Sequence, residues 1–253
     1  MLTTRVMPCL LYYNRGLCKT VKFKNPSYVG DPVNAIKIYN EKEVDELIFL
    51  DITATAENRE PDYKIIRNIA TECFMPLCYG GGITSVEQVK KIFEIGVEKV
   101  SFNHAAIHHP SLITDVAKDF GSQAVIASID VKKNIWGKYE VYQKRGTKTT
   151  GQHPVAFAKK MEDMGAGEIL LTSIDREGTW EGYDNELILR ITESVSIPVI
   201  VNGGAGNLAH LEQAVKVGNA SGLALGSMVV YQKKGMGVLI NFPLRTELEK
   251  ILK

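Results

Sequence analysis

The stretch PLCYGGGIT, residues 76–84, joins a short apolar run to three consecutive glycines, and it decides the fold because it occurs twice. The second copy, PVIVNGGAG, occupies residues 198–206. Gly81 and Gly203 lie 122 residues apart, and the residues that follow each of them keep that offset. An internal repeat of this length predicts a chain built from two similar halves.

The repeat extends well beyond the glycines. Glu46 begins the run ELIFLDITA, and Glu168, again 122 residues later, begins EILLTSIDREG. A chain of 253 residues is a routine length for one barrel domain. We therefore expect a single domain, residues 1–253, made of half-barrels of about 1–122 and 123–253.

Apolar runs alternate with amphipathic segments in both halves. The expected strands are RVMPCLL, ELIFLD, PLCYGG, KVSFN, AVIASID, EILLTS, PVIVNG and GLALG. The expected helices lie near residues 31–40, 60–73, 85–94, 110–119, 152–164, 184–194, 207–216 and 238–251. Apolar strands that are followed by helices are typical of a covered parallel sheet. Eight such units predict an α/β fold of the (β/α)8 TIM barrel class, and the alternative, a doubly wound open sheet, explains the repeat less well.

The composition is that of an ordinary globular protein. The formal net charge is +1, which gives no electrostatic support for nucleic acid or an anionic membrane as a partner. Four cysteines form no C-x-x-C pair, and the first residues lack a signal-peptide pattern. No apolar run approaches the roughly 20 residues that cross a bilayer. These features predict reduced thiols and a cytoplasmic location.

Both glycine stretches follow expected strands, so they should lie at the C-terminal end of the barrel, where active sites form. Glycine lets a backbone approach a ligand closely, and the N-terminus of the next helix offers unpaired N–H groups. Two such turns, related by the repeat, can hold two phosphates on opposite sides of one mouth. This pattern favours a substrate that is phosphorylated at both ends, and the alternative is a pair of tight turns without a ligand.

Longer strings resemble a known family, the cyclase subunit of imidazole glycerol phosphate synthase (HisF). In order over residues 1 to about 230, these strings are RVMPCL, GDPV, DELIFLDITA, YGGGI, KVSFN, FGSQAVIASID, GAGEILLTSIDREGT, GYD and NGGAG. The resemblance implies a (β/α)8 barrel that works with a glutamine amidotransferase subunit, HisH. It also implies that ammonia from this partner travels through the barrel, to be used where a bis-phosphorylated ribonucleotide is cleaved and cyclised.

The resemblance also indicates where a phosphorylated substrate would bind. Gly82 and Asn103 match one phosphate site of the family, and His104 replaces its Thr. The second site is matched on the other side of the barrel, with Glu177 in place of the usual Asp. The full expected substrate- and phosphate-binding set is Lys19, Asp51, Gly82, Asn103, His104, Thr172, Glu177, Gly178, Gly204, Gly226 and Ser227. Asp51 is expected to orient ligand hydroxyls, with a core salt bridge as the alternative.

Charged residues stand at the beginnings of the first, second, fourth and sixth expected strands. They are Arg5, Glu46, Lys99 and Glu168. Two acids and two bases can neutralise one another in a ring at the N-terminal mouth of a barrel. The resemblance implies that this ring is an ammonia gate facing the glutaminase partner, whereas the residues alone also allow a ring that only stabilises the barrel.

Catalysis in the family uses two aspartates, at the ends of the first and fifth strands. Asp130 matches the second, but the position after PCL that should hold the first is Leu11. Paired carboxylates serve general acid and base steps because one can be protonated while the other is charged. Leucine can do neither, so the ordinary cyclisation should be impaired.

Three functions remain open on these grounds. The preferred one is a HisF paralogue that uses ammonia in the acetamidino modification of a surface sugar, beside an ATP-dependent amidating enzyme. The second is a genuine cyclase subunit of histidine biosynthesis. The third is a non-catalytic scaffold that only channels ammonia. None of them requires a cofactor.

Two further features carry weaker signals. His104 and His108 have helical spacing, but no acidic partner is near in sequence, so no metal site is expected. The alternation in KYEVYQK predicts a hairpin within residues 132–148, after the fifth strand. This insert is basic through Lys132, Lys133, Lys144, Arg145 and Lys148. It is either a solvated loop or a lid that attracts phosphate.

Overall fold

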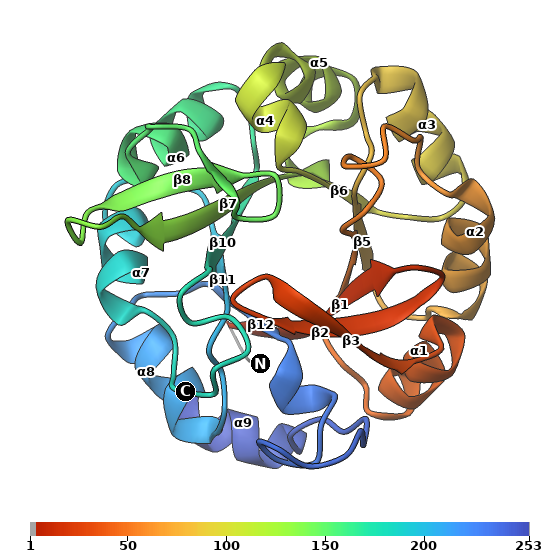
Figure 1. Cartoon of the computed structure of the whole chain (residues 1–253). Helices are drawn as coiled ribbons and strands as arrows, with labels where there is room; N and C mark the ends of the chain where they lie inside the picture. The colour runs from red at the N-terminus through yellow and green to blue at the C-terminus, as the bar shows by residue number, and fades with distance from the viewer. Residues whose placement is uncertain (1–3, 253) are drawn as a thin grey trace.

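A computed structural model describes residues 4–252 and contains a closed ring of eight parallel strands (Figure 1). In ring order the strands are β1 (Arg5–Tyr13), β4 (Leu47–Asp51), β5 (Leu77–Gly80), β6 (Lys99–Phe102), β7 (Val125–Lys133), β10 (Glu168–Ser173), β11 (Val199–Asn202) and β12 (Gly222–Leu225). Parallel pairing of β12 with β1 and of β7 with β10 closes the ring. The predicted (β/α)8 TIM barrel is confirmed.

Helices surround the ring and bury one face each against it. They are α1 (Pro32–Glu41), α2 (Tyr63–Glu72), α3 (Val86–Glu94), α4 (His104–His108), α5 (Ser111–Phe120), α6 (Pro154–Asp163), α7 (Asn185–Thr192), α8 (Leu208–Lys216) and α9 (Arg245–Ile251). Side-chain caps begin several of them, as where Ser85 accepts from the Gln88 amide. No helix within residues 4–252 has the length and apolarity to cross a membrane.

The core has two layers. Side chains such as Ile36, Phe49 and Ile113 fill the space between strands and helices. A separate inner cluster fills the barrel itself with Met7, Cys9, Ile48, Cys78, Ile126, Leu170, Ile200 and Ala224. Each large buried side chain contributes roughly 1.5–3 kcal/mol relative to an exposed one, so the ring is a rigid frame. The open end of this frame positions the candidate site.

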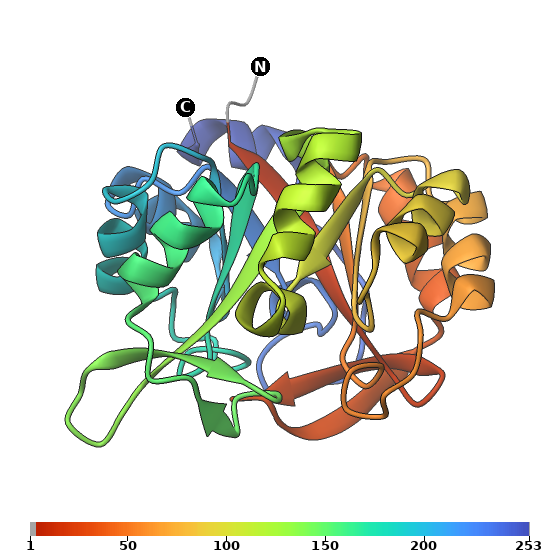
Figure 2. The same cartoon turned by 90° about the horizontal axis from the view of Figure 1, so that it is seen from above.

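Each half of the barrel carries a hairpin after its first strand. One consists of β2 (Gly16–Val21) and β3 (Lys24–Gly30), and the other of β7 with β8 (Tyr139–Gln143), extended by β9 (Lys148–Thr149). Both lie on the same side of the molecule (Figure 2). The second hairpin was predicted. The first was not, because its turn uses Lys22 and Phe23 at φ 54° and 61° in place of the usual glycine.

The predicted elements differ from the observed ones mainly near the C-terminus. The helix expected at 238–251 begins only at Arg245. The preceding segment pairs with the chain after β12, where the Leu239 and Asn241 amides donate to the carbonyls of Val230 and Val229. The second difference is α4, a short helix before α5 that the prediction at 110–119 did not include.

Candidate functional site

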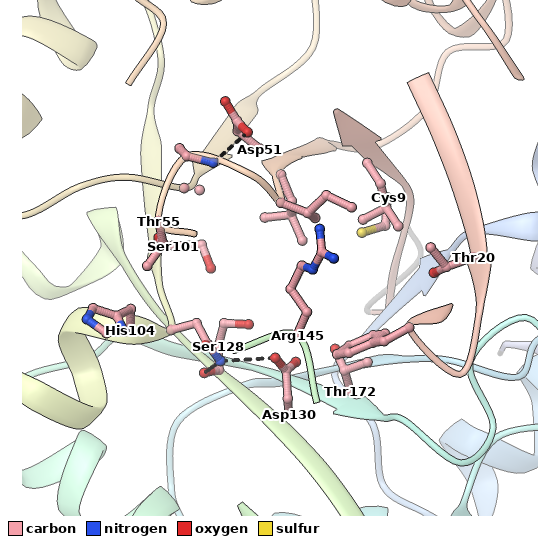
Figure 3. Close-up of a pocket in the computed structure, with 18 of the residues that line it drawn as sticks. Cys9, Thr20, Asp51, Thr55, Ser101, His104, Ser128, Asp130, Arg145 and Thr172 are labelled. Carbon is pink, nitrogen blue, oxygen red and sulfur yellow. Dashed lines mark hydrogen bonds between the residues drawn. The ribbon is translucent and has the colours of Figure 1, made fainter. Parts of the chain in front are cut away.

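A cavity of about 780 Å³ opens at the C-terminal ends of the strands, and all eight barrel strands contribute to its wall. Figure 3 shows the labelled side chains around it, with Asp130 and Thr172 on one side and Asp51 on another. The structure brings the entire predicted set together here. The predicted residues that line this one cavity are Lys19, Asp51, Gly82, Asn103, His104, Asp130, Thr172, Glu177, Gly178, Gly204, Gly226 and Ser227.

Asp130 is the carboxylate best suited to proton transfer. It lies within β7, beside Thr172 of β10 in the sheet register. The Asn103 amide donates to Asp130 Oδ2 at 3.2 Å and to the Ser128 carbonyl at 3.1 Å, which fixes the carboxyl group. Burial, and secondarily the charge of Glu177, raise the pKa of Asp130 to about 7. A group with this pKa can both accept and donate a proton near neutral pH.

Leu11 occupies the wall where the resemblance implies a second catalytic aspartate. It faces Leu50 of β4 and Cys18 of β2 in the sheet, and it packs on the inner apolar cluster. The cavity therefore has an apolar patch at this point. No acid–base chemistry can come from this side chain.

The first glycine turn follows β5 and requires glycine for two reasons. Gly81 and Gly82 have φ values of 122° and 71°, which residues other than glycine rarely adopt. A Cβ on Gly82 would lie 2.8 Å from both the Ala54 Cβ and the Arg59 carbonyl oxygen. The turn is thus packed against the loop after β4, and it presents its backbone to the cavity.

The second glycine turn repeats this design after β11. Gly203 and Gly204 have φ values of 93° and 114°, and the Gly204 carbonyl accepts from the Gly182 amide at 2.8 Å. Gly178, at φ 72°, packs directly on the Thr20 carbonyl and brings the loop after β10 to the same rim. Ser227 and Gly226 complete this side, after β12. Both turns face one mouth, as the repeat predicted.

Lys19 and Glu177 connect the first hairpin to the barrel. Lys19 is buried, its Nζ donates to the Cys9 carbonyl at 2.5 Å, and burial lowers its pKa. Glu177 accepts from the Thr20 hydroxyl at 2.9 Å and from the Phe23 amide at 3.0 Å, and burial raises its pKa. The carboxylate of Glu177 therefore anchors the β2–β3 hairpin as well as lining the cavity.

Asp51 forms the salt bridge that was the less favoured of the two expectations. Its Oδ2 lies 2.7 Å from Arg59, and its Oδ1 accepts from the Thr53 and Ala54 amides at 3.0 and 3.1 Å. The loop after β4 folds Arg59 back over the strand end, so these carboxylate oxygens are already engaged. Asp51 lines the cavity all the same, so its role in ordering ligand hydroxyls stays a prediction.

His104 lines the cavity from the first turn of α4 and lies against His108, with ring centroids 4.4 Å apart and the rings tilted by 40°. Burial, followed by the neighbouring His108, lowers the pKa of His104, which favours the neutral ring at pH 7. A neutral ring brings no positive charge to a phosphate, so His104 can contribute only a hydrogen bond there. Among residues 4–252, no three His, Cys, Asp or Glu side chains are grouped to hold a metal ion.

The site also contains groups that the sequence did not single out. Asn202 donates to the Thr172 hydroxyl at 3.2 Å, and Arg59 pairs with Asp51. Cys9, Thr20 and Ser128 also line the wall. The sequence signal that could have identified the strand residues among them is the alternation of side chains along a strand. This alternation points every second residue near the end of a strand into the barrel mouth.

At the opposite end of the barrel, the structure brings together Arg5, Glu46, Lys99 and Glu168, which we call the charge ring. Arg5 lies 2.7 Å from Glu46 and 3.0 Å from Glu168. Lys99 lies 3.0 Å from Glu46 and 3.1 Å from Glu168. Each base thus contacts both acids, and the side chain of Glu46 is only 3% exposed. The inner apolar cluster separates this ring from the cavity.

Comparison with known proteins gives the same answer over nearly the whole chain. Residues 5–235 match the family model described as histidine biosynthesis protein. The chain is 51% identical over 243 residues to the protein named "Putative imidazole glycerol phosphate synthase subunit hisF2" of Pseudomonas aeruginosa, covering 96% of this chain and 97% of that one. It is 43% identical over 233 residues to the imidazole glycerol phosphate synthase subunit HisF of Alkaliphilus metalliredigens, covering 92% of each. With this fold, this cavity and these relatives, the chain belongs to the HisF family.

Proposed function

We propose that this chain is a cyclase-type (lyase) subunit that receives ammonia from a HisH-like glutamine amidotransferase and uses it on a substrate with two phosphates. The observation that carries the proposal is the position of Asp130. It lies in a cavity bounded by two glycine turns, while the charge ring closes the other end of the same barrel. A substrate held at both ends would present its middle to Asp130.

Each part of the cavity supports one chemical task. The backbone at the glycine turns suits phosphate oxygens, which N–H groups bind without a fixed positive charge. Asp130, with a pKa of about 7, suits proton transfer at the reacting carbons. Lys19, whose pKa is lowered, adds a buried amine beside Gly226. An anionic ligand group bound there would favour the protonated, positively charged form of Lys19.

The proposed ammonia path runs along the barrel axis. The residues between the charge ring and the cavity are apolar or sulfur-containing, such as Met7, Cys78 and Ile126. Ammonia crosses such a lining as a neutral molecule, whereas ammonium and water are disfavoured. Opening the path requires the ring to part, since its four side chains pair with one another. A partner that docks on this end of the barrel is the natural trigger.

Leu11 favours the paralogue among the functions considered. The path and the phosphate turns are retained, but one expected carboxylate is replaced by an apolar side chain that packs on the inner cluster. This combination fits a protein that delivers ammonia to a different reaction. We propose amidation, the acetamidino modification of a surface sugar, with an ATP-dependent amidating enzyme as an additional partner. Standard cyclisation in histidine biosynthesis is the alternative.

Growth complementation distinguishes the sugar-amidating paralogue from the cyclase of histidine biosynthesis. A bacterial strain that lacks its own cyclase subunit would receive this chain, or its Leu11→Asp variant, and would be grown without histidine. The paralogue proposal expects rescue by Leu11→Asp only. Full rescue by the unaltered chain would assign it to histidine biosynthesis. Co-purification with a HisH-like glutaminase from the same organism, and loss of the complex on substitution of Lys99, would test the partner.

A further inference from the structure

The cavity wall contains cations that differ in what they contact. Arg59 pairs with Asp51 at 2.7 Å and with Glu57 at 2.7 Å. Lys19 donates to a carbonyl, and Glu177 is among the charges that act on it. Lys144 and Arg145, at the tip of the β8–β9 hairpin, also line the cavity. Within residues 4–252, neither of these two has an acidic group in ion-pair range.

Arg145 lines the cavity from the hairpin tip. In the view of Figure 3 its guanidinium lies between Thr55, in the loop against which the first glycine turn packs, and Thr20, against which Gly178 packs. Asp130 and Thr172 lie on the same side as the base of its side chain. Arg145 thus stands between the two sides expected to hold phosphate, and it is exposed through the mouth.

The tip that carries Arg145 is held in a demanding conformation. Lys144 and Arg145 have φ values of 51° and 54°, in the left-handed region. Gly146 follows at φ 72°, where a Cβ would lie 3.1 Å from Ile174 and 3.2 Å from Phe23. Phe23 belongs to the tip of the other hairpin, so the two hairpin tips meet above the cavity. This contact orients the tip so that Arg145 points inward.

We propose that Arg145 binds a carboxylate of the substrate, as a third anionic group between its two phosphates. This inference rests on the proposed bis-phosphate site and names a property of its substrate. A planar guanidinium with parallel N–H groups matches a carboxylate in a two-bond arrangement. The wall of the same cavity has the apolar Leu11 where the resemblance implies a carboxylate.

Two other uses of Arg145 fit the geometry less well. Asp130 accepts from the Asn103 amide, and within residues 4–252 it forms no ion pair with Arg145, so Arg145 does not serve as its partner. A phosphate partner is less suitable because both glycine turns already supply backbone N–H groups at the edges of the cavity. What remains opposite Arg145 is the centre of the substrate.

Calorimetric titration with two matched sugar phosphates tests this assignment. The probes are 6-phosphogluconate, which carries a phosphate and a carboxylate, and glucitol 6-phosphate, in which that carboxylate is an alcohol. The unaltered protein should bind 6-phosphogluconate at least about tenfold more tightly. Arg145→Gln should remove this preference and leave the affinity for glucitol 6-phosphate nearly unchanged. Lys148→Gln, on exposed β9 outside the cavity wall, is the matched charge control and should retain the preference.

The outcomes distinguish this inference from the proposed function beneath it. Equal binding of both probes by the unaltered protein would overturn the carboxylate assignment and leave the phosphate site standing. An equal loss for both probes in Arg145→Gln would also overturn it, since the cation would then serve a phosphate. If neither probe bound at millimolar concentration, both the inference and the phosphate site would be wrong.

Discussion

Replacing Leu11 by aspartate should restore the missing carboxylate and lower the stability of the barrel at the same time. Leu11 packs on the inner apolar cluster beside Leu50, and part of its side chain faces the cavity. A fully buried leucine contributes roughly 1.5–3 kcal/mol, so a partly buried one should contribute about 1–2 kcal/mol. We therefore expect the free energy of unfolding of Leu11→Asp to fall by about 1–2 kcal/mol.

The activity should change in the opposite direction. A positioned general acid or base contributes about 10²–10⁴-fold to the rate. With ammonium salt as the nitrogen source, Leu11→Asp should turn over the bis-phosphorylated substrate of the standard synthase at least about a hundredfold faster than the unaltered chain. The assays are single-turnover product formation and urea unfolding, on the same preparations.

Leu11→Asn is the control, because it has nearly the shape and polarity of the aspartate but cannot transfer a proton. It should lose the same stability and gain no activity. If Leu11→Asp were no more active than Leu11→Asn, the missing carboxylate would not be what separates this chain from the standard cyclase. The paralogue proposal would then lose its main support.

Three other substitutions test separate parts of the structure. Because the pKa of Asp130 is raised to about 7 in the folded protein, its contribution to stability is greatest at low pH and is lost as pH rises from about 4 through 7. Compared with the unaltered chain in urea unfolding, Asp130→Asn should therefore be more stabilising at pH 8 than at pH 5, by about 1–3 kcal/mol. Equal effects of the substitution at both pH values would refute the raised pKa. Lys99→Ala removes one base from the charge ring and leaves Arg5 alone with two acids, which should lower the free energy of unfolding by about 1–3 kcal/mol. It should alter turnover driven by glutamine but not turnover driven by ammonium, whereas Lys118→Ala on the exposed face of α5 should change neither stability nor turnover. If the chain were only a scaffold without chemistry of its own, Asp130→Asn would leave the output unchanged. Glu177→Gln weakens the anchor of the β2–β3 hairpin and should speed amide hydrogen exchange within residues 16–30 several-fold. Exchange of residues 139–143, in β8, should stay unchanged. Unchanged exchange in the first hairpin would show that Glu177 does not hold it.

The barrel was predictable because its signal is redundant. The 122-residue repeat, the apolar strands and the glycine turns each point to the same closed ring, and errors at one helix boundary do not change it. The late start of α9 was missed because it depends on tertiary pairing, whereas the helical spacing of His104 and His108 already indicated α4. The segment before α9 is extended because its amides donate to carbonyls of the chain after β12. The sequence of residues 238–244 contains no pattern that predicts this pairing.

Which residues line the site could be predicted, but what each of them contacts could not. Strand ends in a barrel meet at one face, so Asp130, Gly82 and Gly204 had to lie near one another once the fold was known. The partner of Asp51 depends on how the following loop folds, and Arg59 reaches it only because that loop turns back. The sequence likewise predicted Glu177 as a ligand contact, and its cavity position agrees, but that its oxygens also hold the neighbouring hairpin could not be predicted.

The two hairpins explain why the substitutions around the site belong together. Glu177 anchors the first hairpin, whose tip residue Phe23 packs near Gly146 of the second, and Gly146 follows Arg145. A change of chemistry at Leu11 alone would leave a cavity shaped for the old reaction. The cavity wall thus combines an apolar residue at position 11 with Arg145, a cation without an acidic partner in the part of the chain that the structure describes. The combination of Leu11 with such an arginine at the cavity wall fits the proposed use of a different substrate, whereas the left-handed φ of Arg145 follows from its hairpin turn, as it does for Lys22 and Phe23 in the first hairpin.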